Sequence, residues 1–237
     1  GNPCAMHIYT SGGHGFGFRE SFKYHDEMLA DLTRWLETLP SPRPDAVKVA
    51  CIGNSITDGM GIDMASQLGY PAQLQQLLGS NYRVKNYGVS ARTMLNKGDF
   101  PYMNEPAWQD AQAFRPDIAV IKLGTNDSKG YNWKHKEDFE ADYQQMIDAL
   151  KPATILLCTP IKAFEDKWEI TDSVIVNEVI PAIRRVAKRN KLDIIDLHAV
   201  ITDKAMMTRD NIHPNDKGAR QMAEAVAAKI KEIRKNK

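Results

Sequence analysis

Five short apolar runs, separated by helical patterns, are the feature that most restricts how this chain can fold. They read VKVACIG, YRVKNYG, DIAVIKLG, ATILLCT and LDIIDL, at residues 47–53, 82–88, 117–124, 153–159 and 192–197. Several are apolar at almost every position, which is typical of strands that are buried on both faces. The alternation of such strands with helices predicts an α/β fold in which a parallel sheet lies between helix layers.

The helical patterns lie around residues 68–79, 136–150 and 173–190, and Pro181 is expected to kink the last of them. A final helix is expected from about Asn215. Its apolar side chains recur at three- and four-residue steps and form one stripe: Ala219, Met222, Ala223, Val226, Ala227, Ile230 and Ile233. In open parallel sheets, ligands bind at the carboxyl ends of the strands, so the chemistry is expected there.

Prolines divide the chain into two parts. Residues 39–46 read LPSPRPDA, with three prolines within five positions, which forbids a helix and favours an extended connector. We therefore predict an N-terminal extension over residues 1–40, a linker over 41–46 and a larger domain over 47–237.

Composition and motifs restrict the partners and cofactors. The chain has 31 Lys and Arg against 30 Asp and Glu, a near-neutral balance that argues against nucleic acid as a partner. No apolar run approaches the ~20 residues of a membrane span. The stretch GNSITDGMG lacks the Gly-Lys-Ser/Thr ending of a phosphate-binding loop, and no convincing set of metal ligands surrounds Asp210 and His213. These two stretches therefore argue against nucleotide binding and against a metal at Asp210 and His213.

Polar residues stand where the predicted strands end. Ser55 follows the first strand, Gly88 closes the second, Asn126 follows the third, and Asp210 and His213 precede the final helix. Each alone suits an ordinary turn or cap. Together they meet a chemical requirement, because a serine nucleophile needs an imidazole base and that imidazole needs an orienting acid. An oxyanion further needs donors, which the Ser55 and Gly88 amides and the Asn126 side chain can supply.

The four stretches GNSIT, NYGVSART, GTND and DNIHP resemble, in this order, the four conserved blocks of the SGNH (GDSL-like) esterases and lipases, over about residues 46–237. The resemblance implies a flavodoxin-like, three-layer α/β/α fold with a five-stranded parallel sheet and no metal or cofactor. It implies Ser55 as nucleophile, His213 as general base and Asp210 as its orienting acid. Gly88 and Asn126 would complete the oxyanion hole with the Ser55 amide.

Two nearby residues need a separate interpretation. Asn54 stands where many members of that family have Asp, but this side chain is not part of the triad, so activity is still expected. His198 follows the last strand and could pair with Asp196, yet it lies outside the blocks; a core or rim histidine is expected there.

The first forty residues resemble a different class, the C-terminal end of an α/β-hydrolase esterase: a short strand, a glycine-rich loop around His14 and an amphipathic helix. The apolar face of that helix comprises Phe22, Met28, Leu29, Leu32, Trp35, Leu36 and Leu39. His14 is expected to be non-catalytic, because the chain contains no G-x-S-x-G nucleophile elbow. The apolar face needs a cover, so we expect it to pack on the larger domain or on a second copy in a homodimer.

Aromatic and basic residues near the expected site suggest the substrate. Arg92, Tyr131 and Trp133 are expected to bind it, and Trp168 lies in the loop after the fourth strand. No long apolar lid of the lipase kind is evident. The expectation is hydrolysis of small acyl esters, acetyl first, on carbohydrate.

A periplasmic or secreted location is favoured over the cytoplasm, because polysaccharide esters occur outside the cytoplasm. The alternatives are a lysophospholipase or thioesterase with the same triad, and an inactive carbohydrate-binding relative.

Overall fold

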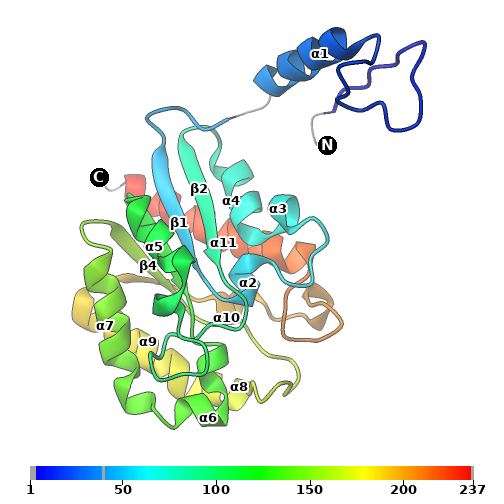
Figure 1. The fold of residues 1–237 in the computed structure, drawn as a ribbon. Coiled ribbons are helices and arrows are strands. Elements are labelled where there is room, and N and C mark those ends of the chain that lie inside the picture. The colour runs from blue at the N-terminus through cyan, green and yellow to red at the C-terminus, as the bar shows by residue number, and fades with distance from the viewer. Residues whose placement is uncertain (1–3, 39–40, 236–237) are drawn as a thin grey trace. The chain divides into compact units, whose positions relative to one another are not determined.

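The apolar runs form a five-stranded parallel sheet in the order β2-β1-β3-β4-β5 (Figure 1). The structure, a computed structural model, describes residues 4–38 and 41–235. The strands are β1 (Val47–Gly53), β2 (Tyr82–Gly88), β3 (Ile118–Lys122), β4 (Thr154–Cys158) and β5 (Asp193–Ile195). Every neighbouring pair is parallel, so the predicted fold class is confirmed.

Helices cover both faces of the sheet (Figure 1). On one face lie α5 (Pro106–Ala113), α7 (Phe139–Ala149) and α9 (Ile180–Asn190); on the other lie α4 (Tyr70–Leu78) and α11 (Asp216–Lys235). The central strand β3 contributes to both cores: Ala119 and Ile121 pack on the first face, and Ile118 and Val120 on the second. With both faces covered, β3 has no exposed position, which explains why residues 118–121 are all apolar.

Shorter elements connect this framework. The short helices are α2 (Ser55–Asp58), α3 (Ala65–Leu68), α6 (Gly130–Trp133), α8 (Asp172–Val174) and α10 (Leu197–Val200). The 3₁₀ turns are η1 (Tyr102–Asn104), η2 (Asn126–Ser128), η3 (Lys136–Asp138) and η5 (Lys204–Met206). None of the described helices combines the length and the apolar character that crossing a membrane requires.

The helix expected over residues 173–190 is interrupted. It consists of α8, a π-helical turn η4 (Ile175–Val179) and α9, and the change from π to α geometry falls directly before Pro181. Proline has no N–H to donate, so the regular ladder cannot continue through this position and the π turn absorbs the break. Helix α5 was not expected from the sequence, because its short segment PAWQDAQA lacks a clear apolar period.

Two glycines allow α2 to lie directly on the strand ends. Gly53 and Gly88 face each other in the register of β1 and β2. A Cβ on Gly53 would lie 2.1 Å from Oγ1 of Thr57, and one on Gly88 would lie 2.2 Å from the backbone nitrogen of Asp58. Any other residue at either position would push α2 off the sheet. Gly88, like Gly53, therefore makes room for α2.

The chain divides into two compact units, Gly1–Pro42 and Arg43–Lys237, and the division falls inside the expected linker. Residues 39 and 40, including Leu39 of the expected apolar face, lie outside the described residues. The sheet and its helices all belong to the second unit.

The first unit contains α1 (His25–Thr38) and a small aromatic cluster. Phe22 is buried and packs against Phe16, Tyr9 and Tyr24, with ring centroids 4.5, 5.8 and 5.7 Å away. The prediction of a short strand before the glycine-rich loop is wrong, because no strand forms in the described part of this unit. The physical reason is that a strand needs a hydrogen-bonding neighbour, and none is present within the unit.

The close approach at the strand ends leads to a prediction. Gly88→Ala should destabilise the protein by about 1–3 kcal/mol or more, because its methyl group has only backbone to displace. Thermal unfolding measures the loss. Gly130→Ala is the matched control, since a Cβ there meets nothing within 4 Å. A Gly88→Ala variant as stable as the wild type would contradict this explanation.

Candidate active site

The turn between β1 and α2 presents Ser55. Asn54 is the N-cap of α2: its carbonyl oxygen accepts from the Thr57 and Asp58 amides, and its side-chain oxygen accepts from the Ile56 amide at 3.2 Å. The capping task that often explains a serine after a strand therefore belongs to Asn54. Ser55 is the first helical residue, and its hydroxyl is free for another partner.

That partner is His213. Ser55 Oγ lies 2.7 Å from Nε2 of His213, although the two residues are 158 positions apart in the chain. His213 precedes α11, and its carbonyl oxygen accepts from the Thr208 amide at 2.8 Å, which holds the turn in place. Both side chains are nearly buried, with 7% and 4% of their surfaces exposed. The structure thus brings together the first two residues of the expected triad.

Asp210 holds the other side of the imidazole ring. Its Oδ2 lies 2.8 Å from Nδ1 of His213, and its Oδ1 accepts from the backbone amides of Ile212 and His213, each at 2.8 Å. Burial alone would raise the pKa of Asp210, but these three hydrogen bonds outweigh burial and lower the pKa to about 2. The ionised carboxylate can only accept, so Nδ1 carries the proton and Nε2 is left to accept the Ser55 proton.

Of the three expected oxyanion donors, two have a free N–H. Asn126, in η2, uses one N–H of its amide on the carbonyl oxygen of Arg92 at 3.1 Å and keeps the second. The Ser55 amide is the first of α2 and has no acceptor within that helix. The Gly88 amide, in contrast, donates to the Asn86 side chain at 2.8 Å. The expectation for Gly88 therefore needs correction: in this conformation its amide is already occupied.

Asp127, a residue that the sequence did not single out, ties two loops of the site together. Its carboxylate accepts from the Met94 and Leu95 amides at 3.1 and 2.8 Å. Complete burial raises the pKa of this carboxyl to about 6 in spite of those bonds. Asp127 thus fixes the loop that carries Arg92, whose carbonyl oxygen in turn orients Asn126.

Two of the three expected substrate-binding residues are occupied elsewhere. The Arg92 guanidinium contacts Glu105 at 2.7 Å and donates to the Ser90 carbonyl oxygen at 2.8 Å. Trp133 is buried, with 8% of its surface exposed, and its indole N–H donates to Glu178 at 2.8 Å. The expectation for Trp133 is corrected here, because a core indole has no free group to offer. The Arg92 guanidinium has further N–H groups besides those that contact Glu105 and Ser90, so its expected role stays a prediction. The sequence placed these residues correctly after the strands but could not show what they pack against.

Two aromatic rings do remain accessible. Tyr131 is 42% exposed and its hydroxyl donates to Asp99 at 3.2 Å. Trp168 is 50% exposed, and its ring centroid lies 5.9 Å from that of His213. Trp168 is therefore an accessible aromatic side chain in contact with the imidazole ring of His213, and the sequence had only suggested its place near the site.

The turn that carries Trp168 is strained. Lys167 and Ile170 form an isolated antiparallel bridge, and Trp168 and Glu169 between them have φ angles of 53° and 61°. Two successive non-glycine residues in the left-handed region cost energy, and such strain gathers at functional sites. The contact between Trp168 and His213 is what places this strained turn at the candidate site.

His198 belongs to a separate structural contact. Its Nε2 lies 3.1 Å from Asp172, and its backbone amide donates to the Thr159 hydroxyl at 3.0 Å. Asp196, which could have been its partner, instead pairs with Arg184 at 2.8 Å. These contacts agree with the interpretation of His198 as a core or rim residue.

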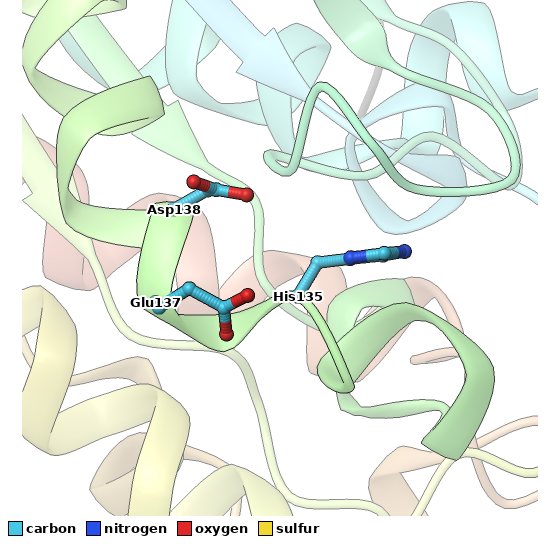
Figure 2. A group of neighbouring side chains, drawn as sticks. All are labelled: His135, Glu137 and Asp138. Carbon is cyan, nitrogen blue, oxygen red and sulfur yellow. The ribbon is translucent and has the colours of Figure 1, made fainter.

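One group of side chains in the described residues has the composition of a cation site: His135, Glu137 and Asp138, around η3 (Figure 2). Figure 2 shows the far edge of the imidazole ring turned away from both carboxylates. Lys97 already places its ammonium 2.8 Å from Oδ2 of Asp138. A metal would have to displace this ion pair, so we assign no metal to the group.

The chain is similar in sequence to known acylhydrolases. Residues 51–221 match the GDSL-like Lipase/Acylhydrolase family. The chain is similar to an acetylxylan esterase of Xylanibacter ruminicola, with 56% identity over 253 residues and 98% of this chain covered. That match covers 53% of the relative, so the chain spans about half the length of the curated relative that it matches.

Solved structures share the fold. An aryl esterase of M. smegmatis has a TM-score of 0.66 at 20% identity, over 79% of this chain and 99% of its own. Est24, a carbohydrate acetylesterase from Sinorhizobium meliloti, has a TM-score of 0.66 at 18% identity, over 79% and 99%. The acetyl xylan esterase AlAXEase has a TM-score of 0.61 at 26% identity, over 78% and 100%.

The low pKa of Asp210 predicts a pH-dependent effect of removing its charge. Its folded pKa lies below the unfolded value of about 3.9, so its contribution to stability is present above about pH 4 and is lost as the pH falls towards 2. Asp210→Asn should therefore be less stable than the wild type at pH 7, with the difference vanishing by about pH 2. Turnover should fall about 10⁴-fold, because the ring loses its orienting anion.

Thermal unfolding between pH 2 and 7 and ester turnover at pH 7 measure the two effects. Asp45→Asn, at an exposed position before β1, is the control and should change neither. A stability difference that stays constant down to pH 2 would contradict the assigned hydrogen bonds.

Proposed function

The chain belongs to the GDSL-like lipase/acylhydrolase family, and on that premise we propose that it is a serine esterase that removes acetyl groups from carbohydrate. The observation that carries the proposal is the continuous chain of contacts from Ser55 Oγ to His213 at 2.7 Å and from His213 to Asp210 at 2.8 Å. This is the arrangement that a serine nucleophile needs before it can attack an ester.

The first half of the proposed reaction forms an acetyl-enzyme. Ser55 Oγ attacks the acetyl carbonyl carbon while its proton passes to Nε2 of His213. The Ser55 amide and the free N–H of Asn126 stabilise the oxyanion of the tetrahedral intermediate. The bond to the sugar oxygen then breaks, and His213 returns the proton to that oxygen. Asp210 stays ionised throughout and stabilises the imidazolium.

The second half regenerates the enzyme. A water molecule gives a proton to Nε2 of His213 and attacks the acetyl carbon. The bond between that carbon and Ser55 Oγ breaks, the oxygen takes back the proton from His213, and acetate leaves. Both halves use the same donors, so no further group is required.

Two observations support carbohydrate as the bearer of the acetyl group. The relative with 56% identity is an acetylxylan esterase, and one structural neighbour is a carbohydrate acetylesterase. Trp168 places an exposed ring next to His213, where the apolar face of a sugar ring can stack on it. Because polysaccharide esters occur outside the cytoplasm, we also propose a periplasmic or extracellular location.

We further propose that the first unit is the end of an α/β-hydrolase-type domain of a longer protein. The match to the acetylxylan esterase covers 98% of this chain and so extends into this unit. Met6, Ile8 and Phe18 are 85%, 84% and 69% exposed, an unusual density of exposed apolar side chains. These apolar side chains need a surface to pack against. That surface would come from the larger domain, from the rest of the α/β-hydrolase-type domain, or from a second copy in a homodimer.

The function is tested by acetate release from acetylated xylan, acetylated sialic acid and p-nitrophenyl acetate, with longer acyl chains measured alongside. We expect acetyl esters to be preferred and Ser55→Ala to lose several orders of magnitude in turnover, since triad members act as a unit. A preference for acyl chains of eight or more carbons would favour a lysophospholipase or thioesterase. Failure of Ser55 to react with a fluorophosphonate, with no turnover, would indicate a binding protein.

The role of Trp168 is tested by two substitutions. Trp168→Ala should lower kcat/KM for acetylated xylo-oligosaccharides about tenfold, the equivalent of about 1.4 kcal/mol, while triacetin turnover stays near wild type. Trp168→Gly should lose the same affinity without becoming less stable, because glycine adopts a φ of 53° without strain. Equal losses on triacetin and on the oligosaccharide would show that the ring serves His213 rather than the sugar.

A further inference from the structure

A lysine lies fully buried beneath the candidate site. Lys122 is the last residue of β3, directly opposite Gly53 of β1, and none of its surface is exposed. Lysine is almost never fully buried without an ion partner, because removing an ammonium from water is costly. In the sequence it is the one charged residue within the apolar part of DIAVIKLG. Neither the triad nor the oxyanion donors use it.

The Lys122 ammonium contacts the two turns that carry the catalytic groups. Nζ donates to Oγ1 of Thr125 at 2.9 Å and to Oδ1 of Asn54 at 3.3 Å. Thr125 directly precedes Asn126, and Asn54 directly precedes Ser55. One nitrogen atom therefore lies between the nucleophile turn and the oxyanion turn.

The Asn54 contact orients the cap of α2. The Asn54 amide nitrogen is buried and has no hydrogen-bond partner among the described residues, so the side chain is held only through its oxygen. That oxygen binds the Ile56 amide and Lys122. Without Lys122, the side chain of Asn54 would keep a single hydrogen bond, and the residue before Ser55 would be less constrained.

Stability does not explain why a lysine occupies this position. The titratable groups that act on it, Cys158 at the end of β4 and Asp127 after β3, favour its charged form, but burial outweighs them and lowers the pKa of Lys122 to about 7. The folded pKa lies below the unfolded value of about 10.4, so the charge on Lys122 destabilises the folded state. This destabilisation is complete below about pH 7 and becomes smaller as the pH rises towards 10. An apolar side chain of similar length would remove that cost.

We propose that Lys122 is a positioning residue that sets the distance between Ser55 and Asn126 by holding Asn54 and Thr125 together from beneath. The inference rests on the proposed roles of Ser55 and Asn126. Catalytic geometry tolerates about 0.5 Å of displacement, and a misplacement of about 1 Å can cost 10²-fold in rate. A buried donor with two acceptors on different turns meets this requirement.

The first test is Lys122→Met, which keeps the length and removes the donors. We expect kcat for p-nitrophenyl acetate to fall about 100-fold with KM changed less than threefold. The unfolding temperature should be equal to or above that of the wild type at pH 6, and this advantage should shrink towards pH 10. Lys188→Met, the same substitution on the exposed face of α9, is the matched control and should change none of these values.

A kcat within threefold of wild type for Lys122→Met would overturn the proposal. So would a loss of stability that accompanies the loss of kcat, since the role would then be structural. Ser55→Ala separates the two proposals: if it abolishes turnover while Lys122→Met does not, the esterase assignment stands and only the role of Lys122 fails. If Ser55→Ala retains turnover, the esterase mechanism itself fails.

A second test leaves the lysine in place. Thr125→Val keeps the shape of the side chain but removes the acceptor, so kcat should fall several-fold. A wild-type kcat would overturn the proposal even if Lys122→Met failed to fold.

A double-mutant cycle of Lys122→Met with Asn54→Ala should be non-additive, with the double variant no more than twofold slower than the slower single variant. Losses that multiply would show that Lys122 does not act through Asn54.

Discussion

The seat of α2 on the ends of β1 and β2 is the constraint on which the rest of the site depends. Gly53 and Gly88 are paired across these strands, and a Cβ on either would lie within 2.2 Å of α2. The close packing places Ser55 at the carboxyl end of β1, between β2 on one side and β3 on the other. In sheets of this type the chain moves outwards in opposite directions from such a point, which leaves space for a ligand. Ser55, His213 and Asp210 are connected there by hydrogen bonds.

Three ionisable groups of the candidate site show how burial and hydrogen bonding shift a pKa. Asp210 accepts from His213 and from two backbone amides and has a pKa of about 2, whereas complete burial raises the pKa of Asp127 to about 6 in spite of its backbone amide donors. Lys122, without any carboxylate in contact, has a pKa of about 7. The carboxylate that pairs with His213 is the one that is only partly buried. The other two groups hold loops in place, a task that hydrogen bonding performs in either protonation state.

The sequence largely predicted which residues of the candidate site lie together. It hardly predicted which partner each side chain contacts. Ser55, Asp210 and His213 could be predicted because nucleophile, base and acid have fixed chemical requirements and stand at strand or helix ends. Arg92 and Trp133 were placed in the right loops but serve Glu105 and the core. Nothing in the sequence distinguishes a tryptophan that faces a substrate from one that faces a core, because both choices bury apolar surface.

What the sequence determined by itself was the periodic burial of the strands, their order along the chain, and the residues that end them. Those features are local, and a buried parallel strand or a proline break has the same signature in any context. Only the tertiary structure decided which donors remain free, that the Gly88 amide is occupied by Asn86, and that Trp168 and Lys122 contact the site. Apart from the Gly88–Asn86 hydrogen bond, whose partners are two residues apart, these are contacts between segments far apart in the chain. Which group contacts a given side chain depends on the three-dimensional packing of these segments. The spacing of residues along the sequence does not contain that information.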